Sequence, residues 1–316
     1  MTVVSTTAPT VGRSVQEPVR RSARDRYDRR EVLTAVGLLI PALVILGTFV
    51  IYPIVSGGFL SLTSWNGFGT AQQFVGLDNY ARILADDEFW NSLLVTVVYA
   101  VGVGVLSVAS GLAIALLLDA PLRGLAVYRG IYFLPVVTSS VAAAIVWRYM
   151  LDPSGVVNRL LSGVGLPTVD WLNQRWTALA ALTLLTVWKN LGFNAILYLT
   201  ALQALPVSLT EAAQLDGAGL VQRTRWMTIP LLRPMTFFVV VQALITAFQS
   251  FDLVYVLTGG GPTGGTEVLG MLMYRYAFKL GQFGYGAAIA FATLALMLGV
   301  TLVQWKAAGS GESDLA

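Results

Sequence analysis

FWNSLLVTVVYAVGVGVLSVASGLAIALLL, residues 89–118, contains no charged residue and only a few polar ones. A helix needs about 20 apolar residues to cross a hydrocarbon core of roughly 30 Å. This run is long enough to cross a bilayer at a tilt or to extend beyond it. The stretch therefore predicts a transmembrane helix.

The composition of the whole chain agrees with a membrane protein. Of the 316 residues, 56% are hydrophobic and 12% are charged, whereas soluble domains carry about 25% charged residues. A charge at the bilayer centre costs about 3 kcal/mol or more, so membrane segments exclude it. We therefore attribute the net charge of +3 to basic residues at a cytoplasmic face and not to nucleic-acid binding.

Five further segments resemble the first, and together they predict an all-α, polytopic membrane protein with six transmembrane helices. The third contains Pro135, the fourth contains Lys189, and the fifth is free of charge until Asp252. The segment nearest the N-terminus, residues 33–54, is too long for an ordinary cleaved signal peptide, and we interpret it as an uncleaved membrane anchor. The six predicted spans are residues 33–54, 89–118, 130–147, 176–202, 234–257 and 280–305.

The regions outside the spans complete the predicted organisation. Residues 1–31 are rich in Thr, Pro and Arg and predict a disordered cytoplasmic tail. Residues 32–306 form the six-span domain, and residues 307–316 form a polar cytoplasmic tail. With the N-terminus inside, the inner segments hold thirteen basic residues and the outer segments hold six. This asymmetry predicts that both termini are cytoplasmic.

The residue types present also limit the chemistry. The chain has no cysteine and no histidine, so it has no disulfide, thiol nucleophile, histidine metal site or histidine-based triad. A membrane-embedded enzyme would depend on scattered carboxylates, most of which fall outside the predicted spans. We therefore expect no catalytic residue and no metal site.

PVSLTEAAQLDGAGLVQRTRWMTIP, residues 206–230 and named the EAA segment, interrupts the apolar pattern with charges and glycines. Ser208 and Glu211 have the spacing of a capping box at a helix start. Gly217 and Gly219 are expected to end that helix, and residues 220–228 predict a second short one before Pro230. The spacing alone leaves two interpretations open: an amphipathic connector with solvated charges, or a docking element for a cytoplasmic partner.

The stretch EAAQLDGAGLVQRTRWMTIPLLRP at 211–234 resembles the EAA loop of permease subunits in bacterial ATP-driven (ABC) importers. Met227 and Ile229 depart from the usual residues but keep apolar side chains, and Thr224 replaces a common aromatic residue. The positions that match in register, and that would couple the chain to an ATPase, are Glu211, Ala212, Ala213, Asp216, Gly217, Ala218 and Pro230.

Other stretches resemble the six-span branch of these permeases that imports sugars and glycerol phosphates. They span about residues 32–306 and occur in the same order as in that branch. The stretches are YPIV at 52, FVGLDNY at 74, YFLP at 132, VWKNLGFNAILYLTALQALP at 187, FDLVYVLTGGGP at 251 and GYGAAIAF at 284.

The resemblance implies a subunit that moves solute by alternating access in a bacterial inner membrane and catalyses no covalent chemistry. Its partners would be a second homologous permease, two ATPase subunits that bind ATP and Mg, an external solute-binding protein and membrane lipid. The EAA segment would enter a cleft of an ATPase, where Glu211 could bond to a partner arginine. Leu215, Met227 and Ile229 would hold the segment to the bundle.

GGGPTGGTE at 259–267 has two glycines at the spacing of a phosphate-binding loop, but Thr266 and Glu267 follow where lysine and Ser or Thr are needed. We therefore expect no cofactor in this chain. The stretch is interpreted as a flexible outer turn where the binding protein docks.

Polar residues inside the fourth and fifth spans predict a solute pathway, because intramembrane polar groups are costly and often functional. The alternative is that they only bond neighbouring helices together. Lys189 has two further interpretations, as a partner of Asp252 or of a carboxylate on a second permease, or as a contact for a phosphate-bearing solute. The candidate residues are Lys189, Asn190, Asn194, Tyr198, Gln242, Thr246 and Gln249.

A secondary transporter driven by an ion gradient remains the alternative function. Such transporters are often built from internal repeats with paired interrupted helices. The chain shows Pro135 in one half but no convincing repeat.

Overall fold

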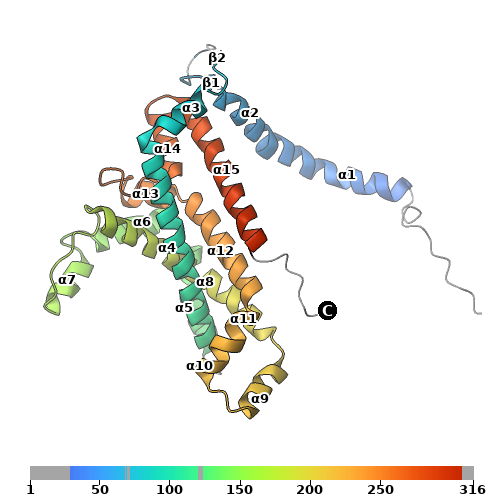
Figure 1. Cartoon of the computed structure of the whole chain (residues 1–316), viewed down its shortest axis with the longest axis vertical. Helices are drawn as coiled ribbons and strands as arrows, with labels where there is room; N and C mark the ends of the chain where they lie inside the picture. The colour runs from blue at the N-terminus through green and yellow to red at the C-terminus, as the bar shows by residue number, and fades with distance from the viewer. Residues whose placement is uncertain (1–28, 68, 70–71, 120–123, 308–316) are drawn as a thin grey trace, which may run out of the picture. The chain divides into compact units, whose positions relative to one another are not determined.

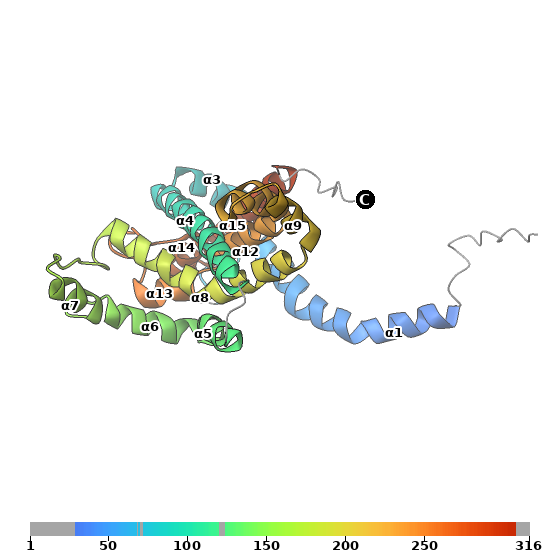
Figure 2. The same ribbon diagram turned by 90° about the horizontal axis from the view of Figure 1, so that it is seen from below.

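The computed structural model describes residues 29–67, 69, 72–119 and 124–307. Most of these residues are helical and only one short hairpin is β-structure, which confirms the prediction of an all-α protein (Figures 1 and 2). The predicted tails, residues 1–31 and 307–316, fall almost wholly outside the described residues and stay predictions.

Twenty short and long elements make up the described chain, and helices dominate them. In chain order they are α1 (Arg29–Leu46), η2 (Gly47–Ile51), α2 (Tyr52–Ser61), β1 (Thr63–Ser64), β2 (Gln73–Phe74), α3 (Asp78–Ala85), α4 (Asp87–Leu118), α5 (Leu125–Val137), α6 (Ser140–Met150), α7 (Val156–Gly163), α8 (Arg175–Gln203), α9 (Val207–Leu215), α10 (Leu220–Arg223), η3 (Thr224–Thr228), α11 (Ile229–Leu231), α12 (Arg233–Phe248), α13 (Asp252–Leu257), α14 (Leu269–Tyr274), η4 (Arg275–Lys279) and α15 (Phe283–Ala307). The η elements are π-helical turns.

The chain divides into two compact units, residues 1–56 and 57–316. In the first unit, the described residues form α1, η2 and the start of α2. Val36–Ser61 is a helix of 26 residues with a mean hydropathy of 2.5, long and apolar enough to cross a membrane. Its apolar residues lie all round the helix, a pattern typical of a lipid-facing span.

The second unit is organised around α8, which lies between α4 and α5 (Figure 2). A Cβ on Gly111 of α4 would lie 2.9 Å from the Cβ of Asn194 on α8. A Cβ on Gly192 would overlap the backbone of Tyr132 and Phe133 in α5. Small residues at such contacts let helix backbones approach closely, which is how membrane helices associate.

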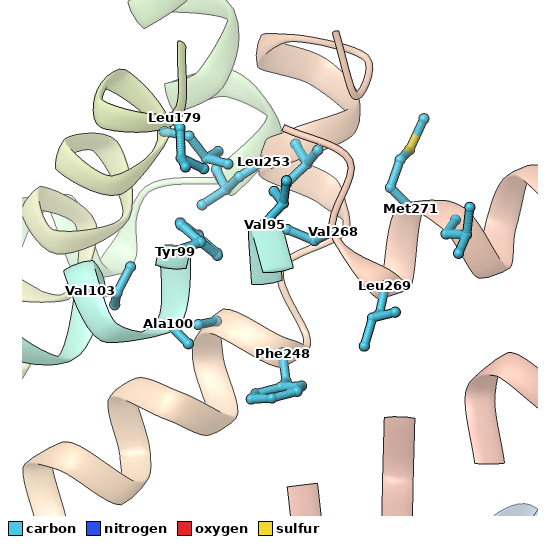
Figure 3. Close-up of a cluster of buried hydrophobic side chains, with 14 of the residues drawn as sticks. Val95, Tyr99, Ala100, Val103, Leu179, Phe248, Leu253, Val268, Leu269 and Met271 are labelled. Atoms are coloured by element: carbon cyan, nitrogen blue, oxygen red, sulfur yellow. The ribbon is translucent and has the colours of Figure 1, made fainter. Parts of the chain in front are cut away.

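The main hydrophobic core joins α4, α8 and the segments from α12 to α15 (Figure 3). Tyr99, Leu182 and Leu272 are fully buried in it. A short antiparallel hairpin pairs Thr63 with Phe74 at the end of the unit that also carries α3 (Figure 1). The EAA segment lies at the opposite end of the same unit (Figure 1).

Among the described residues, four helices are long and apolar enough to span a membrane, and there are up to six if each of two bent helix pairs counts as one span. The four are Val36–Ser61, Asp87–Leu118, Arg175–Gln203 and Phe283–Lys306. They match the predicted first, second, fourth and sixth spans. The six-span count itself stays a prediction.

The predicted third span, residues 130–147, is wrong as a single helix. The axes of Val127–Val137 and Ser140–Met150 differ by 97°. Thr138 and Ser139 are extended between them, and the Thr138 hydroxyl bonds to the carbonyl of Pro135 at 2.7 Å. A Thr hydroxyl that bonds nearby backbone offers the chain an alternative to helix, which explains the break.

The predicted fifth span, residues 234–257, is also divided. Helix α12 ends at Phe248, and α13 begins only at Asp252. A second bend of 69° separates Leu220–Leu231 from Arg233–Phe248. Pro234 follows this bend at the start of α12, a position where its missing N–H breaks no helical bond.

Replacing Gly192 by Ala is expected to lower the free energy of unfolding by about 1–3 kcal/mol, because overpacking against the α5 backbone cannot be relieved by a side-chain rotation. The measurement is thermal unfolding of the purified protein in detergent micelles. Gly104→Ala is the matched control, since nothing lies within 4 Å of a Cβ there. Equal effects of the two changes would contradict the close α5–α8 contact.

Candidate functional site

The EAA segment forms two helical stretches joined by a sharp turn. The N–H of Ala218 bonds to the carbonyl of Ala213 at 2.9 Å, and the N–H of Gly217 bonds to that of Gln214 at 3.0 Å. This pair of bonds is the Schellman arrangement, which needs a left-handed residue. Gly217 supplies it with φ +79°, so the predicted role of Gly217 in ending the helix is confirmed.

Other local predictions for this segment are wrong. The helix begins at Val207 after Pro206, so Ser208 is already inside the helix and forms no cap. Gly219 has φ −67° and is extended; its N–H bonds to Gln222 Oε1 at 3.0 Å. The second helical stretch runs from Leu220 through Pro230 to Leu231, because the π-helical turn η3 accommodates the proline.

The expected apolar anchors also differ. Leu215 is 89% exposed and cannot hold the segment to the bundle, while Met227 is half-buried and Ile229 is 43% exposed. Thr228 and Leu232 are the buried residues nearby. Helical spacing alone does not tell which side of a short helix faces the bundle, so the sequence could not decide this.

The tip of the EAA segment is an exposed apolar surface that sequence reasoning missed. Leu215, Val221 and Trp226 are 89%, 77% and 74% exposed. Large apolar side chains left this exposed are a common feature of protein interaction sites. Glu211 and Asp216 are exposed on the same short element. A concavity of about 450 Å³ between the two helical stretches is lined by Asp216, Gly217, Arg223 and Trp226, among others.

Four of the predicted pathway residues meet between α4, α8 and α12. Asn190, Asn194, Gln242 and Thr246 line a polar cavity of about 10 Å³ together with Ser107 of α4. Asn194 is 3% exposed and Ser107 is 1% exposed. The side chains of these two residues donate to no protein group among the described residues. A cavity of this size with polar walls fits one water and no solute.

The sequence missed Ser107 because a single serine in a long apolar run carries no signal of its own. Two predicted pathway residues lie elsewhere. The Tyr198 hydroxyl donates to Thr236 of α12 at 3.1 Å, within a second core cluster. Gln249 follows α12 and is exposed. Tyr198 therefore matches the interpretation as a bond between helices.

The side chain of Lys189 bonds to the backbone at the break between α5 and α6. Its Nζ donates to the carbonyl of Thr138 at 2.6 Å. The described residues contain two ion pairs, and Arg275 makes both of them. The predicted ion pair between Lys189 and Asp252 is therefore not formed. Thr138 directly follows the C-terminus of α5, and a positive charge placed there, such as that of Lys189, also interacts favourably with the dipole of α5.

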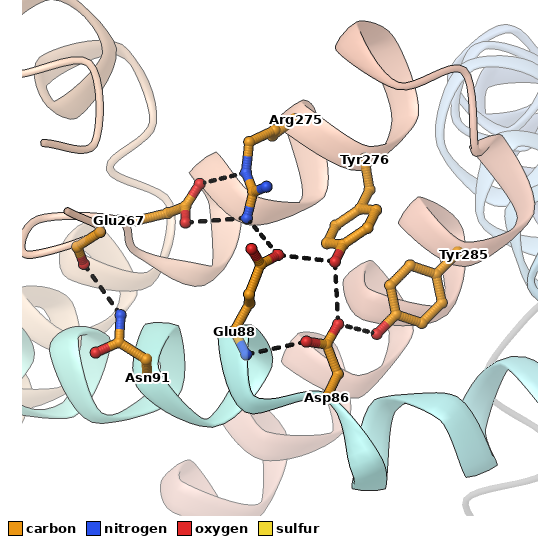
Figure 4. Close-up of polar contacts among 8 residues, drawn as sticks. Asp86, Glu88, Asn91, Glu267, Arg275, Tyr276 and Tyr285 are labelled. Atoms are coloured by element: carbon orange, nitrogen blue, oxygen red, sulfur yellow. Dashed lines mark hydrogen bonds and ion pairs between the residues drawn. The ribbon is translucent and has the colours of Figure 1, made fainter.

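A second polar cluster lies at the end of the unit that carries α3 (Figure 4). Arg275 donates to Glu267 at 2.8 Å and to Glu88 at 2.7 Å. Tyr276 donates to Glu88 at 2.8 Å and lies 3.2 Å from Asp86. Burial, with the carboxylates of Glu88 and Asp86, raises the pKa of Tyr276 above its ordinary value. The phenol therefore stays protonated and keeps donating.

The glycine-rich stretch 259–267 is held by this cluster and is not the loose turn that was expected. Gly264 accepts from Asn91 Nδ2 at 3.1 Å, and Thr266 bonds to Thr258 at 2.7 Å. Thr266 and Glu267 are 0% and 9% exposed. Glu267 accepts from Arg275, which lies eight residues later in the sequence. The spacing of the glycines gave no indication of this bond.

Comparison with known proteins places these features in one family. Residues 107–306 match the model of the binding-protein-dependent transport system inner membrane component. The chain is 38% identical to the probable ABC transporter permease protein YurN of Bacillus subtilis, over 87% of this chain and 96% of YurN. It is 37% identical to the trehalose/maltose transport system permease protein MalF of Thermococcus litoralis, over 88% of this chain and 94% of MalF.

A solved structure shares the fold. It is a bacterial alginate ABC transporter in complex with an alginate pentasaccharide-bound periplasmic protein, and its chain matches with a TM-score of 0.75 and 23% identity. The match covers 87% of this chain and 93% of the other. Since the family match extends over most of the chain, from α4 to α15, the chain belongs to the binding-protein-dependent transport system inner membrane components, the permease subunits of ABC transporters.

Proposed function

We propose that this chain is a permease subunit of an ATP-driven importer for a sugar, an oligosaccharide or a related polyol or glycerol-phosphate solute. The observation that carries the proposal is the EAA segment, a rigid helix–turn–helix with exposed apolar residues at its tip. Relatives named as sugar permeases support the solute class. The chain itself moves solute and leaves ATP hydrolysis to partner subunits.

The turn at Gly217 would make the EAA segment a transmitter of motion. Its two hydrogen bonds fix α9 against the second helical stretch, so a force on the tip reaches Thr228, Leu232 and the start of α12. Leu215, Val221 and Trp226 would fill an apolar cleft of the ATPase, and Glu211 would form a charge-assisted bond with an ATPase arginine.

The solute path would lie between this chain and a second permease. The polar cavity between α4, α8 and α12 holds only about 10 Å³, which is far less than the roughly 300–1,000 Å³ of small-molecule sites. Two faces related by pseudo-symmetry could enclose the larger space that a sugar needs. Asn190 and Asn194 would meet the solute only when the helices separate during alternating access.

The partners that complete the proposal are a second homologous permease, two ATPase subunits holding ATP and Mg, and an extracytoplasmic solute-binding protein. The structure of the alginate importer with its periplasmic protein supports the last of these. The chain would lie in a bacterial inner membrane with both termini cytoplasmic, in agreement with the excess of basic residues in the inner segments.

The function is tested by mild purification of the chain from its native membrane, followed by uptake into proteoliposomes. We expect an ATPase and a second permease to copurify, and uptake to require ATP and to survive loss of the ion gradient. Recovery of the chain alone, with uptake driven by an ion gradient, would mean a secondary transporter and an EAA segment that only connects two spans.

Glu211→Ala and Gly217→Val are expected to uncouple ATP hydrolysis from uptake. The first removes the carboxylate, and the second strains a residue at φ +79°, where a β-branched side chain is disfavoured. Uptake should fall at least tenfold at normal protein levels, while the ATPase keeps a basal rate that substrate no longer stimulates. Gln214→Ala, exposed on the same helix, should change neither. Full substrate-stimulated transport in both variants would refute coupling through this segment.

Asn194→Leu and Lys189→Met are expected to raise the apparent KM for uptake or lower its rate severalfold, because they remove polar groups from the proposed path and from the α5–α6 break. Gln249→Leu serves as a matched control, since Gln249 lies outside the polar cavity. Uptake kinetics would be measured at equal protein levels. Unchanged affinity and rate in both variants would leave these residues as helix-packing groups.

A further inference from the structure

The connection between α6 and α8 carries an apolar surface that the proposed transport function does not use. It contains α7, Val156–Gly163, which lies at the periphery of the second unit in both views (Figures 1 and 2). Four of its large apolar side chains, named the α7 face, are more than half exposed. They are Val156 at 51%, Leu160 at 67%, Val164 at 74% and Leu166 at 53%.

The spacing of these residues gives α7 two different sides. Val156, Leu160 and Val164 are four residues apart, so they follow one another along the same side of the helix. Asn158, on another side, is 1% exposed, and Leu161 is half-buried. The helix therefore packs on the protein with one side and presents a continuous apolar stripe with the other.

Asn158 holds the connection in a fixed shape. Its Nδ2 donates to the carbonyls of Pro153 and Val169 at 3.2 Å and 2.9 Å. Its Oδ1 accepts from the N–H of Val169 at 3.0 Å and from Nε1 of Trp171 at 3.2 Å. These bonds tie the residues before α7 to the residues after it. The exposure of the α7 face is thus a property of a rigid element.

The two turns beside α7 are equally well defined. A Cβ on Gly155 would overlap the carbonyl of Met150, so the chain turns directly against the end of α6. After α7, the N–H of Leu166 bonds to the carbonyl of Leu161 at 2.9 Å. This bond closes a helix-ending turn that needs a left-handed residue, and Gly165 provides it with φ +80°. The α7 face therefore cannot turn inward without breaking these bonds.

The helices on either side of the connection carry the residues of a membrane–water boundary. Tyr149, near the end of α6, is 75% exposed, and Trp176, at the start of α8, is 64% exposed. Tyr and Trp are enriched where lipid headgroups meet hydrocarbon. Helix α8 has 29 residues and is about 43 Å long at 1.5 Å per residue, so it extends beyond a hydrocarbon core of roughly 30 Å. The connection is thus continuous with surfaces that lie in the membrane.

Arg159 adds a positive charge next to the apolar stripe. It is exposed and forms no ion pair among the described residues. Its Nε donates to the carbonyl of Ser154 at 2.9 Å, and a guanidinium has four further N–H groups. Arginine places its apolar stem along hydrocarbon and its charged end among headgroups. An apolar stripe beside a basic residue is typical of a helix that lies in the membrane interface.

Two observations favour lipid over a protein as the cover of the α7 face. Membrane helices that pack on each other use small residues at the contact, as Gly192 does between α5 and α8, whereas the α7 face consists of Val and Leu. A soluble partner would leave these side chains in water each time it dissociated, which is unfavourable for a rigid apolar surface. A bilayer covers the surface at all times.

We propose that α7 is an interfacial helix whose face inserts into the outer leaflet of the lipid bilayer. Val156, Leu160 and Val164 contact acyl chains, and Arg159 donates to lipid phosphates. The helix thereby fixes the depth at which α6 and α8 are connected. The lipid contact stands on α7 itself, and only its assignment to the outer leaflet rests on the orientation given under the proposed function.

Spin labelling tests the lipid contact, because the chain has no cysteine and a single introduced cysteine is labelled alone. The full chain is placed in nanodiscs of phosphatidylethanolamine and phosphatidylglycerol, without ATP. The collision rates of the label with oxygen, which concentrates in hydrocarbon, and with a water-soluble nickel chelate are then compared. At Leu160→Cys we expect oxygen collisions to exceed nickel collisions several-fold. Ser162→Cys is the matched control, because Ser162 is exposed on the opposite side of α7, and there we expect the reverse.

Equal oxygen-to-nickel ratios at the two positions, or a nickel preference at Leu160→Cys, would overturn the lipid contact. Low collision rates with both reagents at Leu160→Cys would mean that a protein covers the face, which overturns it as well. An unaltered unfolding temperature in both variants shows that α7 is intact.

The leaflet is tested separately with a membrane-impermeant thiol reagent on right-side-out vesicles, which should label Ser162→Cys. Absence of labelling, with the oxygen preference at Leu160→Cys retained, would overturn the outer-leaflet assignment and the proposed orientation but not the lipid contact. Ion-driven uptake by a chain that keeps the oxygen preference would overturn only the proposed function.

Discussion

The hydroxyl of Tyr99 is the point on which the packing of the second unit depends. It is fully buried and bonds to Thr186 of α8 at 2.7 Å and to Ser250, just after α12, at 2.9 Å. Because hydrocarbon offers no water to a polar group, these bonds hold α4, α8 and the α12–α13 break in one arrangement. The core of Figure 3 forms around this link, and the break is stable because its polar groups find partners there.

The sequence predicted what depends on composition and local geometry. Long apolar runs identified four helices, since 20 apolar residues have few other stable environments, and Gly217 marked the turn that ends α9. At the bend after Val137, the bond of the Thr138 hydroxyl to Pro135 is local, but the bond that Lys189 donates to the Thr138 carbonyl comes from 51 residues away and was not predictable from the sequence. The spacing of Asn190 and Asn194 indicated a shared face correctly, but Ser107, which completes their cavity, gave no signal.

The cluster around Arg275 shows the same limit. Its bonds join residues separated by up to 199 positions, and no pattern in either segment indicates the other. The glycines at 259–261 and 264–265 suggested a loose turn, yet Asn91, Thr258 and Arg275 hold that stretch in place. Polar contacts between distant segments thus hold the end of the second unit that carries α3, whereas the EAA segment at the opposite end is shaped by local bonds (Figure 1).

The small size of the polar cavity bears on the water that this subunit can hold. Protons cross a protein along continuous files of water, and a space of about 10 Å³ accommodates roughly one water. The cavity that Ser107 and Asn194 line is therefore too small to hold a file of water by itself.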